Sequence, residues 1–152
     1  MTQDFKWYIN PVFWCALIAW LVAQGTKMLT HFVRTREIDF HYLVSTGGVP
    51  SAHSAMAAAL ATSVGLQIGF SEPLFAVTLA FAIVVMFDAQ SVRRAAGQQA
   101  KLLNQIVAEI FKEHHFSQQK LAELLGHTPL EVFLGLLMGV LTALIVLSRF
   151  GM

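Results

Sequence analysis

Four long apolar runs, each opened by one of the chain's four prolines, dominate this sequence of 152 residues. The runs cover residues 11–26, 50–70, 73–87 and 129–148. A helix needs about 20 residues to cross the hydrocarbon core of a bilayer, with a range of about 17–25, so the first and third runs need flanking residues. Proline favours the first turn of a helix because its missing N–H would have no partner there. The sequence therefore predicts four membrane-spanning helices.

The composition agrees with a membrane protein. Hydrophobic residues make up 56% of the chain and charged residues 12%, whereas a soluble domain is about 45–50% apolar and about 25% charged. This composition excludes intrinsic disorder and argues against a soluble enzyme. The net charge of +1 gives no indication of a nucleic acid partner, and the single cysteine excludes both an internal disulfide and a cysteine-based zinc site.

Polar residues mark the beginnings of the four runs. Asn10 and Thr128 each precede a proline directly, and Ser51 and Ser71 lie at the other two starts. Side chains of this kind accept hydrogen bonds from the first N–H groups of a helix. We therefore expect helices to begin at these positions.

The one long polar segment, residues 93–125, separates the third run from the fourth. Apolar residues recur within it at helical spacing, namely Leu102, Leu103, Ile106, Val107, Ile110 and Phe111. This pattern predicts an amphipathic helix on the membrane surface or against the bundle, a break at residues 114–117 and a short helix to residue 125. The predicted fold is a single all-α domain over residues 1–152, a polytopic membrane bundle of about four transmembrane helices plus this interfacial helix.

Basic residues are distributed unevenly around the predicted spans. Eight of the ten lie in the segments 27–49 and 88–128, which four spans place on one side of the membrane; the other two are Lys6 and Arg149. Cytoplasmic loops of membrane proteins are rich in Lys and Arg. We therefore expect an integral protein of a bacterial inner membrane, with these two segments in the cytoplasm and both termini outside.

Ionisable side chains next to the spans gather on this basic side. Lys27 closes the first run, Asp88 closes the third, and His53 lies near the start of the second. An ionisable group at the centre of a membrane helix costs about 2.5–3.5 kcal/mol on insertion scales. These side chains lie near the helix ends, where the cost is lower, and they can serve as partners for each other.

Two strings at helix beginnings carry the strongest chemical pattern. Residues 47–54 read GGVPSAHS, and the first turn of the helix they open presents N–H groups to an anion. Residues 126–132 read GHTPLEV, which places His127 and Glu131 on one helix face if the helix includes both. A carboxylate beside an imidazole fixes its tautomer and raises its basicity. Two histidines, a carboxylate and several cations suit phosphoryl transfer through a histidine nucleophile.

These residues resemble the type 2 phosphatidic acid phosphatase superfamily, which also contains the vanadium haloperoxidases. The closest resemblance is to its short divergent membrane branch of bacteria and plastids, over about residues 10–148. The superfamily's first motif is Lys, six residues, Arg-Pro; Lys27 and Arg34 have this spacing, and Thr35 replaces the proline. Its second motif is Pro-Ser-Gly-His, and residues 50–53 read Pro-Ser-Ala-His.

The third motif of that superfamily is Ser-Arg, five residues, His, three residues, Asp. His127 and Glu131 keep the spacing from histidine to carboxylate, whereas Lys120 and Leu121 occupy the Ser-Arg positions. The divergent branch offers another source for the missing cation, which is Arg93 or Arg94 from a different segment.

The resemblance implies a membrane phosphatase that hydrolyses a lipid phosphate or a prenyl (pyro)phosphate through a phosphohistidine, without a metal or other cofactor. It implies that His127 is the nucleophile, that Glu131 orients it and that His53 protonates the leaving oxygen. The implied phosphate binders are Lys27, Arg34, Ser51, Arg93 and Arg94. We further expect Asp88, Gly48 and Pro50 to support the site.

Simpler interpretations stay open at this point. His53 can be a buried helix histidine, and His127 can be an interfacial loop residue. The whole protein can be a non-catalytic membrane protein that binds lipid phosphate or serves in assembly, because the third motif lacks Ser-Arg and carries Glu for Asp. Gly135 and Gly139 permit close packing of the last helix, either within the chain or between two copies in a homodimer.

Overall fold

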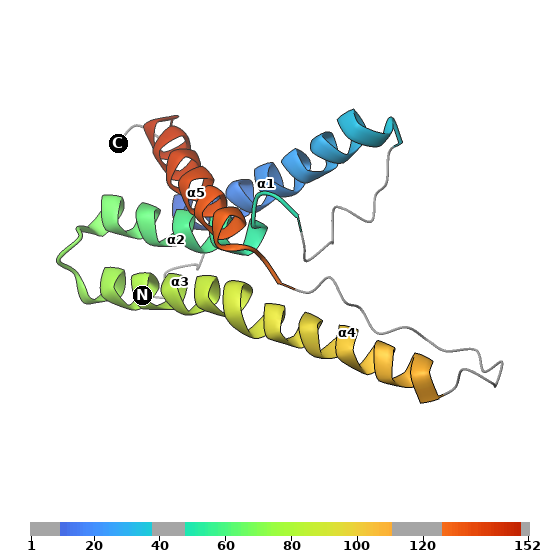
Figure 1. The fold of residues 1–152 in the computed structure, drawn as a ribbon. Coiled ribbons are helices and arrows are strands. Elements are labelled where there is room, and N and C mark those ends of the chain that lie inside the picture. The colour runs from blue at the N-terminus through green and yellow to red at the C-terminus, as the bar shows by residue number, and fades with distance from the viewer. Residues whose placement is uncertain (1–9, 38–47, 111–125, 150–152) are drawn as a thin grey trace, which may run out of the picture.

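The structure is a computed structural model that describes residues 10–37, 48–110 and 126–149, with the side chains of Arg34, Glu109 and Ile110 outside the description. The elements in chain order are α1 (Pro11–Thr35), α2 (Ala52–Ile68), α3 (Pro73–Phe87), the π-helical turn η3 (Asp88–Val92), α4 (Arg93–Ile110) and α5 (Pro129–Arg149). Every element in the described ranges is a helix (Figure 1), which confirms the predicted all-α class.

The outer surface of the bundle is apolar. Within the described residues, three helices are long and apolar enough to cross a membrane, over Pro11–Val33, Pro73–Ala108 and Pro129–Arg149. Large apolar side chains such as Val77 and Val84 on α3 are more than half exposed. An apolar surface of this extent is stable against lipid and not against water, so the structure is that of a polytopic membrane bundle.

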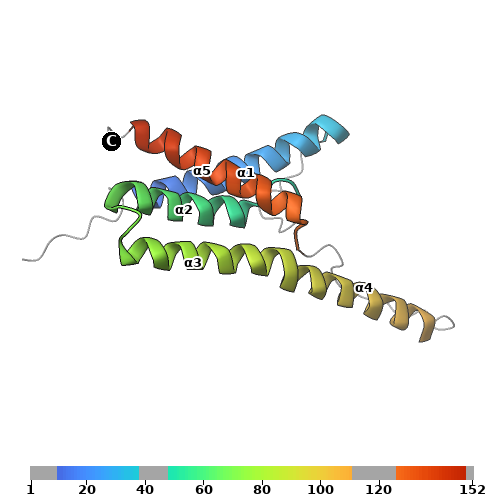
Figure 2. The ribbon, with the colours of Figure 1, turned by 60° about the vertical axis from the view of Figure 1, so that its left-hand side comes forward.

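The remaining predicted span, α2, has 17 residues and forms the centre of the bundle. It packs against α1, α3 and α5, with α3 on one side and α1 and α5 on the other (Figure 2). Its buried residues are Ala52, Ser54, Ala55, Ala57, Ala58, Ala59, Ala61, Ser63, Val64 and Gly65. Because these side chains are small, three helices can approach the α2 backbone closely.

Gly135 and Gly139 bring α5 onto α2 within the chain. A Cβ atom at Gly135 would collide with the carbonyl oxygen of Ser51, and one at Gly139 with that of Ala55. The close packing that this pair permits is therefore used between two helices of the same chain.

The predicted helix beginnings are confirmed at three of four positions. The Asn10 side chain accepts a hydrogen bond from the Val12 N–H at 2.9 Å, and Ser51 and Thr128 cap α2 and α5 in the same way. Ser71 is not a cap, because α3 begins after Glu72, whose side chain makes no capping bond. The helix α2 begins two residues later than expected, since Ser51, and not Pro50, occupies the cap position.

Two predicted helix ends are wrong. α1 does not end near residue 26 but continues to Thr35, so Lys27 lies inside the helix and does not close it. The chain from residue 27 to residue 35 contains no proline or glycine, so the backbone stays helical although the side chains become more polar. The helix ends where Arg36 adopts a left-handed conformation and its N–H bonds the Phe32 carbonyl at 2.8 Å.

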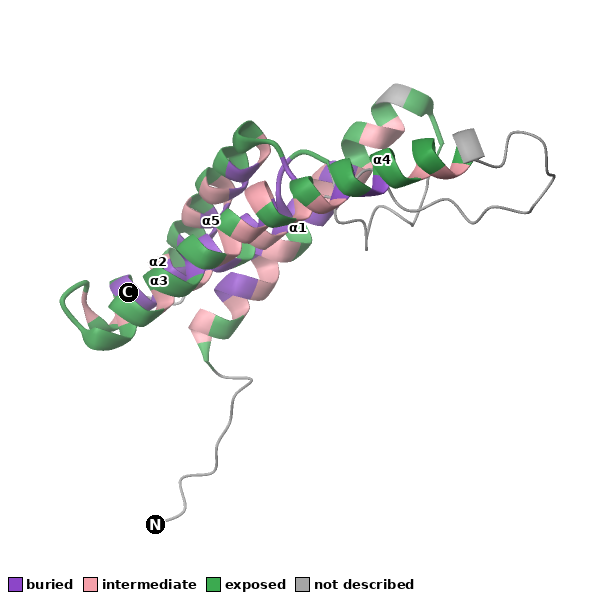
Figure 3. Ribbon diagram, turned by 60° about the horizontal axis from the view of Figure 1, so that its bottom comes forward, coloured by how far each residue is buried: buried purple, intermediate pink, exposed green. Residues whose placement is uncertain are grey.

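The third run does not end at Phe87 either, because α3 continues through η3 into α4 (Figure 2). The apolar residues Leu102, Leu103 and Ile106 lie on α4, are exposed and share the predicted helical spacing. Exposed residues cover most of α4 (Figure 3). The predicted break at residues 114–117 and the short helix to residue 125 lie outside the described residues.

Candidate active site

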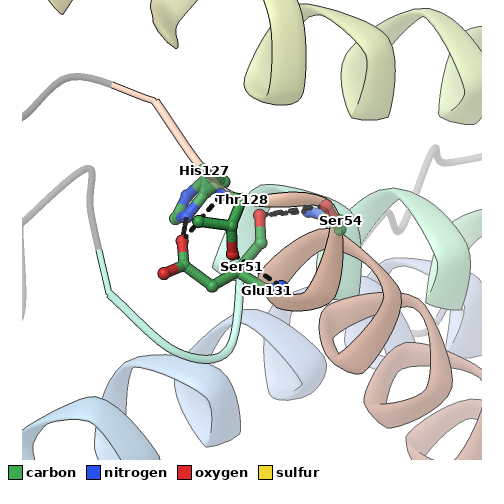
Figure 4. Close-up of polar contacts among 5 residues, drawn as sticks. All are labelled: Ser51, Ser54, His127, Thr128 and Glu131. Atoms are coloured by element: carbon green, nitrogen blue, oxygen red, sulfur yellow. Dashed lines mark hydrogen bonds and ion pairs between the residues drawn. The ribbon is translucent and has the colours of Figure 1, made fainter.

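His127 lies two residues before α5, and hydrogen bonds hold both its backbone and its ring. Figure 4 shows the ring beside Glu131. Its N–H donates to the carbonyl oxygen of Ala89 in η3 at 2.8 Å. Its ring Nδ1 lies 2.9 Å from Oε2 of Glu131, and the residue is 1% exposed. Because α5 begins at Pro129, the two residues do not share a helix face as the spacing suggested; Glu131 instead reaches back from the first turn to the ring.

Glu131 also caps its own helix. The Thr128 N–H donates to Glu131 Oε2 at 3.2 Å, and the Glu131 N–H donates to Thr128 Oγ1 at 3.3 Å. This reciprocal pair is a capping box, whose sequence signal is Ser or Thr followed three residues later by Glu or Gln. Sequence reasoning missed this signal, although the string from Thr128 to Glu131 contains it. One carboxylate oxygen thus accepts hydrogen bonds from the imidazole ring and from the helix start.

The partner of the ring decides which nitrogen of His127 carries hydrogen. An ionised carboxylate can only accept, so the hydrogen is on Nδ1. Nε2 is buried and has no hydrogen-bond partner within the described residues. Burial lowers the pKa of His127 below its ordinary value, and the hydrogen bond to Glu131 opposes that effect. The arrangement favours a neutral imidazole whose Nε2 lone pair is unused.

The start of α2 lies against the start of α5. The Ser51 N–H donates to the backbone oxygen of Glu131 at 3.0 Å, so this N–H is already bonded within the chain. The Ser51 hydroxyl oxygen accepts hydrogen bonds from the N–H and the hydroxyl of Ser54, at 3.3 and 2.9 Å. Within the described residues, the N–H groups of Ala52 and His53 have no partner, and both belong to the first turn of a helix. Two backbone donors for an anion therefore remain at this point.

The buried cation of the site comes from the middle of α1. Lys27 is 2% exposed, and its aliphatic stem covers Gly48, where a Cβ would lie 3.8 Å from Lys27 Cδ. Its charge interacts with that of Glu131 and acts on the His127 ring. Lys27 thus brings a positive charge to the surroundings of the imidazole, and Gly48 and the buried Pro50 lead the chain past Lys27 into α2.

The second cation, Arg93, is the first residue of α4 and directly follows the π-helical turn. Arg93 Nε donates to Asp88 Oδ2 at 2.8 Å. The charge of Arg93 interacts with both His53 and His127. In the described part of the chain no such interaction is found for Arg94, whose side chain is exposed. Arg93 is therefore the one of the two that faces the histidines.

The structure brings six of the predicted ionisable side chains together from four parts of the chain. They are Lys27, His53, Asp88, Arg93, His127 and Glu131. Arg94 stays apart from them, and the side chain of Arg34 is outside the description. Among the residues that the structure describes, no three His, Cys, Asp or Glu side chains are grouped so as to hold a metal ion.

Comparison with known protein families shows which family the chain belongs to. The model of the Divergent PAP2 family matches residues 8–142 of the chain. The chain belongs to the Divergent PAP2 family. The resemblance to the phosphatidic acid phosphatase-related superfamily is thereby confirmed, and the site of this PAP2-related chain lies inside the matched region.

A relative of this Divergent PAP2 chain is an uncharacterized membrane protein, YuiD, of Bacillus subtilis (strain 168). It is 42% identical over 141 residues, which cover 86% of this chain and 89% of the relative. No solved structure matches the chain. Together with the three membrane-crossing helices, the similarity to a membrane protein identifies this chain as an integral membrane protein.

Proposed function

We propose that this protein is an integral membrane phosphatase that hydrolyses a lipid phosphate or a prenyl (pyro)phosphate through a phosphohistidine at His127. The observation that carries the proposal is the state of the His127 ring. Its Nδ1 is hydrogen bonded to Glu131, and its Nε2 is buried without a partner in the described residues. A buried polar atom without a hydrogen-bond partner costs free energy, so its presence needs an explanation. In the proposed reaction this nitrogen is the nucleophile that attacks phosphorus, which explains why no side chain of the described residues bonds it.

In the first step, His127 Nε2 attacks phosphorus and the bond from phosphorus to the ester oxygen breaks. His53, half-buried at the start of α2, donates a proton to that leaving oxygen. The imidazole becomes positively charged as it forms the N–P bond, and the Glu131 carboxylate on Nδ1 stabilises this charge. Lys27 and Arg93 offset the negative charge of the phosphoryl oxygens, with the Ala52 and His53 N–H groups as further donors.

In the second step, water replaces the leaving group. His53, now without its proton, takes one from water as the water oxygen attacks phosphorus. The N–P bond breaks, inorganic phosphate leaves, and both histidines return to their starting states. The charge stabilisation in both steps comes from this chain's own lysine, arginine and backbone N–H groups, so the proposed reaction needs no metal ion.

The surroundings of the site favour a substrate with an apolar tail. The charged groups lie where α2 and α5 begin, and apolar side chains cover the outer faces of the helices that lead away from them. A lipid or prenyl phosphate would place its phosphate among these charges and its tail in the bilayer. We place the site on the cytoplasmic side of a bacterial inner membrane, because the basic residues gather on that side of the chain.

The proposal is tested by phosphate release from the purified protein in detergent. The substrates are phosphatidate, phosphatidylglycerophosphate and prenyl (pyro)phosphates, and the variants are His127→Ala and His53→Ala. We expect His127→Ala to abolish release and His53→Ala to lower it by about 10²–10⁴-fold, as for loss of a general acid. His31→Ala is the matched control, since His31 lies on α1 and contacts Thr35; its rate should stay that of the wild type.

Trapping of the intermediate gives a second test. Brief reaction with ³²P-labelled substrate followed by denaturation in alkali should leave label on the wild type and none on His127→Ala. Release that is unaffected by His127→Ala would show that the nucleophile is another residue. Binding of phosphate without any release from this panel would favour the alternative, a non-catalytic protein that binds lipid phosphate or serves in assembly.

A further inference from the structure

The π-helical turn η3 connects the two halves of the candidate site. In an α-helix, the Arg93 N–H would bond the carbonyl oxygen of Ala89, four residues before it. Here it bonds the carbonyl oxygen of Asp88, five residues before it. The Ala89 oxygen is thereby released from the helix, and it accepts the His127 N–H at 2.8 Å. The irregularity in the helix supplies the acceptor that holds the backbone of His127.

The same turn also aligns a pair of side chains. Asp88 and Arg93 are five residues apart and form an ion pair of 2.8 Å. In a regular α-helix, residues five apart point about 140° away from each other, since successive residues differ by about 100°. The wider turn brings the two onto one face, which directs the charge of Arg93 toward His53 and His127.

A glycine allows the chain to come close enough to this turn. Gly126 has a φ of +93°, and a Cβ there would lie 2.8 Å from the Arg93 carbonyl carbon and would collide with the Arg94 nitrogen. Any other residue at this position would hold the segment that carries His127 away from η3. Ala89, whose carbonyl oxygen accepts the His127 N–H, is buried at this contact and is 1% exposed.

We infer that η3 is a positioning element of the active site, which fixes His127 and Arg93 relative to each other: the Ala89 carbonyl holds the nucleophile's backbone, and Asp88 holds the phosphate-binding guanidinium. The inference rests on the proposed function for its catalytic meaning. Its structural part is the hydrogen bond between η3 and the His127 amide, which can be tested without a measurement of activity.

The first test removes the irregularity and nothing else. Deletion of Gln90 lets the helix run as a regular α-helix, in which the Ala89 oxygen bonds the Arg94 N–H and no longer accepts from His127. Asp88 and Arg93 then lie four residues apart, so they still face each other. Deletion of Gln105 from α4, beyond the site, is the matched control because it leaves η3 unchanged.

The readout that needs no activity is hydrogen exchange of the His127 amide, followed by NMR on protein labelled with ¹⁵N-histidine in detergent micelles. We expect this amide to exchange about 10-fold or more faster without Gln90, as expected for loss of a protecting hydrogen bond. The control deletion should leave the exchange unchanged. An equally protected amide in both deletion variants would overturn the inference.

Phosphate release then tests the catalytic meaning. We expect deletion of Gln90 to lower the rate by about 100-fold, as for a misplacement of about 1 Å. Deletion of Gln105 should leave the rate within about 3-fold of the wild-type rate, which is a small change compared with the expected loss of about 100-fold. Full activity without Gln90 would overturn the positioning role. If the wild type releases no phosphate, the proposed function fails, while the exchange measurement still tests η3.

A cycle of substitutions keeps the inference testable if the deletion does not fold. If Asp88 acts through Arg93, Asp88→Ala should lower phosphate release by about 10-fold in the wild type and by nothing further in Arg93→Ala. A merely structural role for Asp88 would lower the rate by the same factor in both backgrounds, and that result would overturn the inference.

Discussion

At the scale of single residues, Glu131 performs two tasks with one oxygen atom. Its Oε2 accepts hydrogen bonds from the His127 ring and from the Thr128 N–H, which is the start of α5. The capping box needs a side chain that reaches from the third helical position back to the cap, and glutamate has that reach. This gives a physical reason for glutamate where the third motif of the superfamily has aspartate.

Replacement of Glu131 should therefore change the pH dependence of the reaction. In the proposed reaction the His127 nucleophile must be neutral, so the rate should fall as pH drops through the pKa of His127. Glu131 raises that pKa, so in Glu131→Gln the acid limb should move to lower pH. The maximal rate should drop by about 10–100-fold, as for loss of a residue that orients a functional histidine.

The measurement for this variant is the pH profile of phosphate release in detergent. Glu72→Gln is the matched control, because Glu72 is exposed at the start of α3 and makes no side-chain capping bond. An acid limb that stays in place in Glu131→Gln would show that Glu131 does not act on the nucleophile.

The cap at Thr128 allows stability and activity to be separated. Thr128→Ala and Asn10→Ala each remove one capping bond, at the starts of α5 and α1. Each should lower the free energy of unfolding by about 1 kcal/mol. Thr128→Ala should also reduce phosphate release, since Glu131 loses a bond that fixes it, whereas Asn10→Ala should not. The measurements are the free energy of unfolding in detergent and the rate of phosphate release from one substrate. Equal rates of release in the two variants would contradict the prediction.

At the scale of elements, the contact of α5 with α2 sets the position of the whole site. The two helices touch at Gly135 and Gly139, and their first turns are joined by the bond from the Ser51 N–H to the Glu131 carbonyl. The starts of α2 and α5 therefore form one unit. A shift of either helix would move His53 relative to His127.

Gly139→Ala should disturb this unit. The added Cβ would collide with the Ala55 carbonyl, which is backbone and cannot rotate away. We expect a loss of about 1–3 kcal/mol in the free energy of unfolding, as for overpacking of a close contact. The measurement is unfolding of the purified protein by denaturant in micelles. Gly25→Ala is the matched control, since a Cβ at Gly25 meets nothing within 4 Å; equal stability of both variants would contradict this packing.

The helix beginnings were predictable from sequence because they depend on local chemistry. Asn10, Ser51 and Thr128 each accept a bond from an N–H two or three residues away. The helix ends were not predictable in this way. Hydropathy shows where side chains become polar, but it does not show where the backbone leaves the helical conformation. Lys27 was for this reason placed at the end of α1, although it lies inside it.

Within the candidate site, the pairing of His127 with Glu131 followed from their spacing, although the helix does not include both. The choice of Arg93 over Arg94 did not follow, because it depends on the angle set by the π-helical turn. That turn binds the His127 N–H, which comes from a distant part of the sequence. A local pattern cannot show a bond of this kind.

At the scale of the whole molecule, α1 begins and α5 ends on one side of the bundle, and α2 and α5 begin on the other (Figure 2). α1 and α4 continue past this second side in diverging directions (Figure 1). Apart from α2, with its 17 residues, each of these helices contributes to a membrane-crossing stretch. The two sides therefore differ, because the candidate site at the starts of α2 and α5 lies on one of them, together with α4 and the end of α1.

Reporter fusions test the proposed orientation. Alkaline phosphatase fused after Met152 should be active outside the cytoplasm, and a fluorescent protein at the same place should be dark. Insertion of either reporter after residue 110, in the segment between α4 and α5, should give the opposite result and serves as the matched control. A fluorescent fusion at Met152 would contradict the orientation.

The shortness of α2 has a consequence for the depth of its start in the membrane. Its 17 residues make a helix about 26 Å long, while the hydrocarbon core of an average bilayer is about 30 Å thick. α2 is surrounded by α1, α3 and α5, so the lipid need not thin to match it. If its far end lies at the opposite boundary of the core, its start lies about 4 Å inside the hydrocarbon. The start of α2 carries His53 and the two backbone donors, so in the proposed reaction a phosphate has to enter below the headgroups to meet them. The thickness of the host membrane would then set how far a lipid phosphate has to reach.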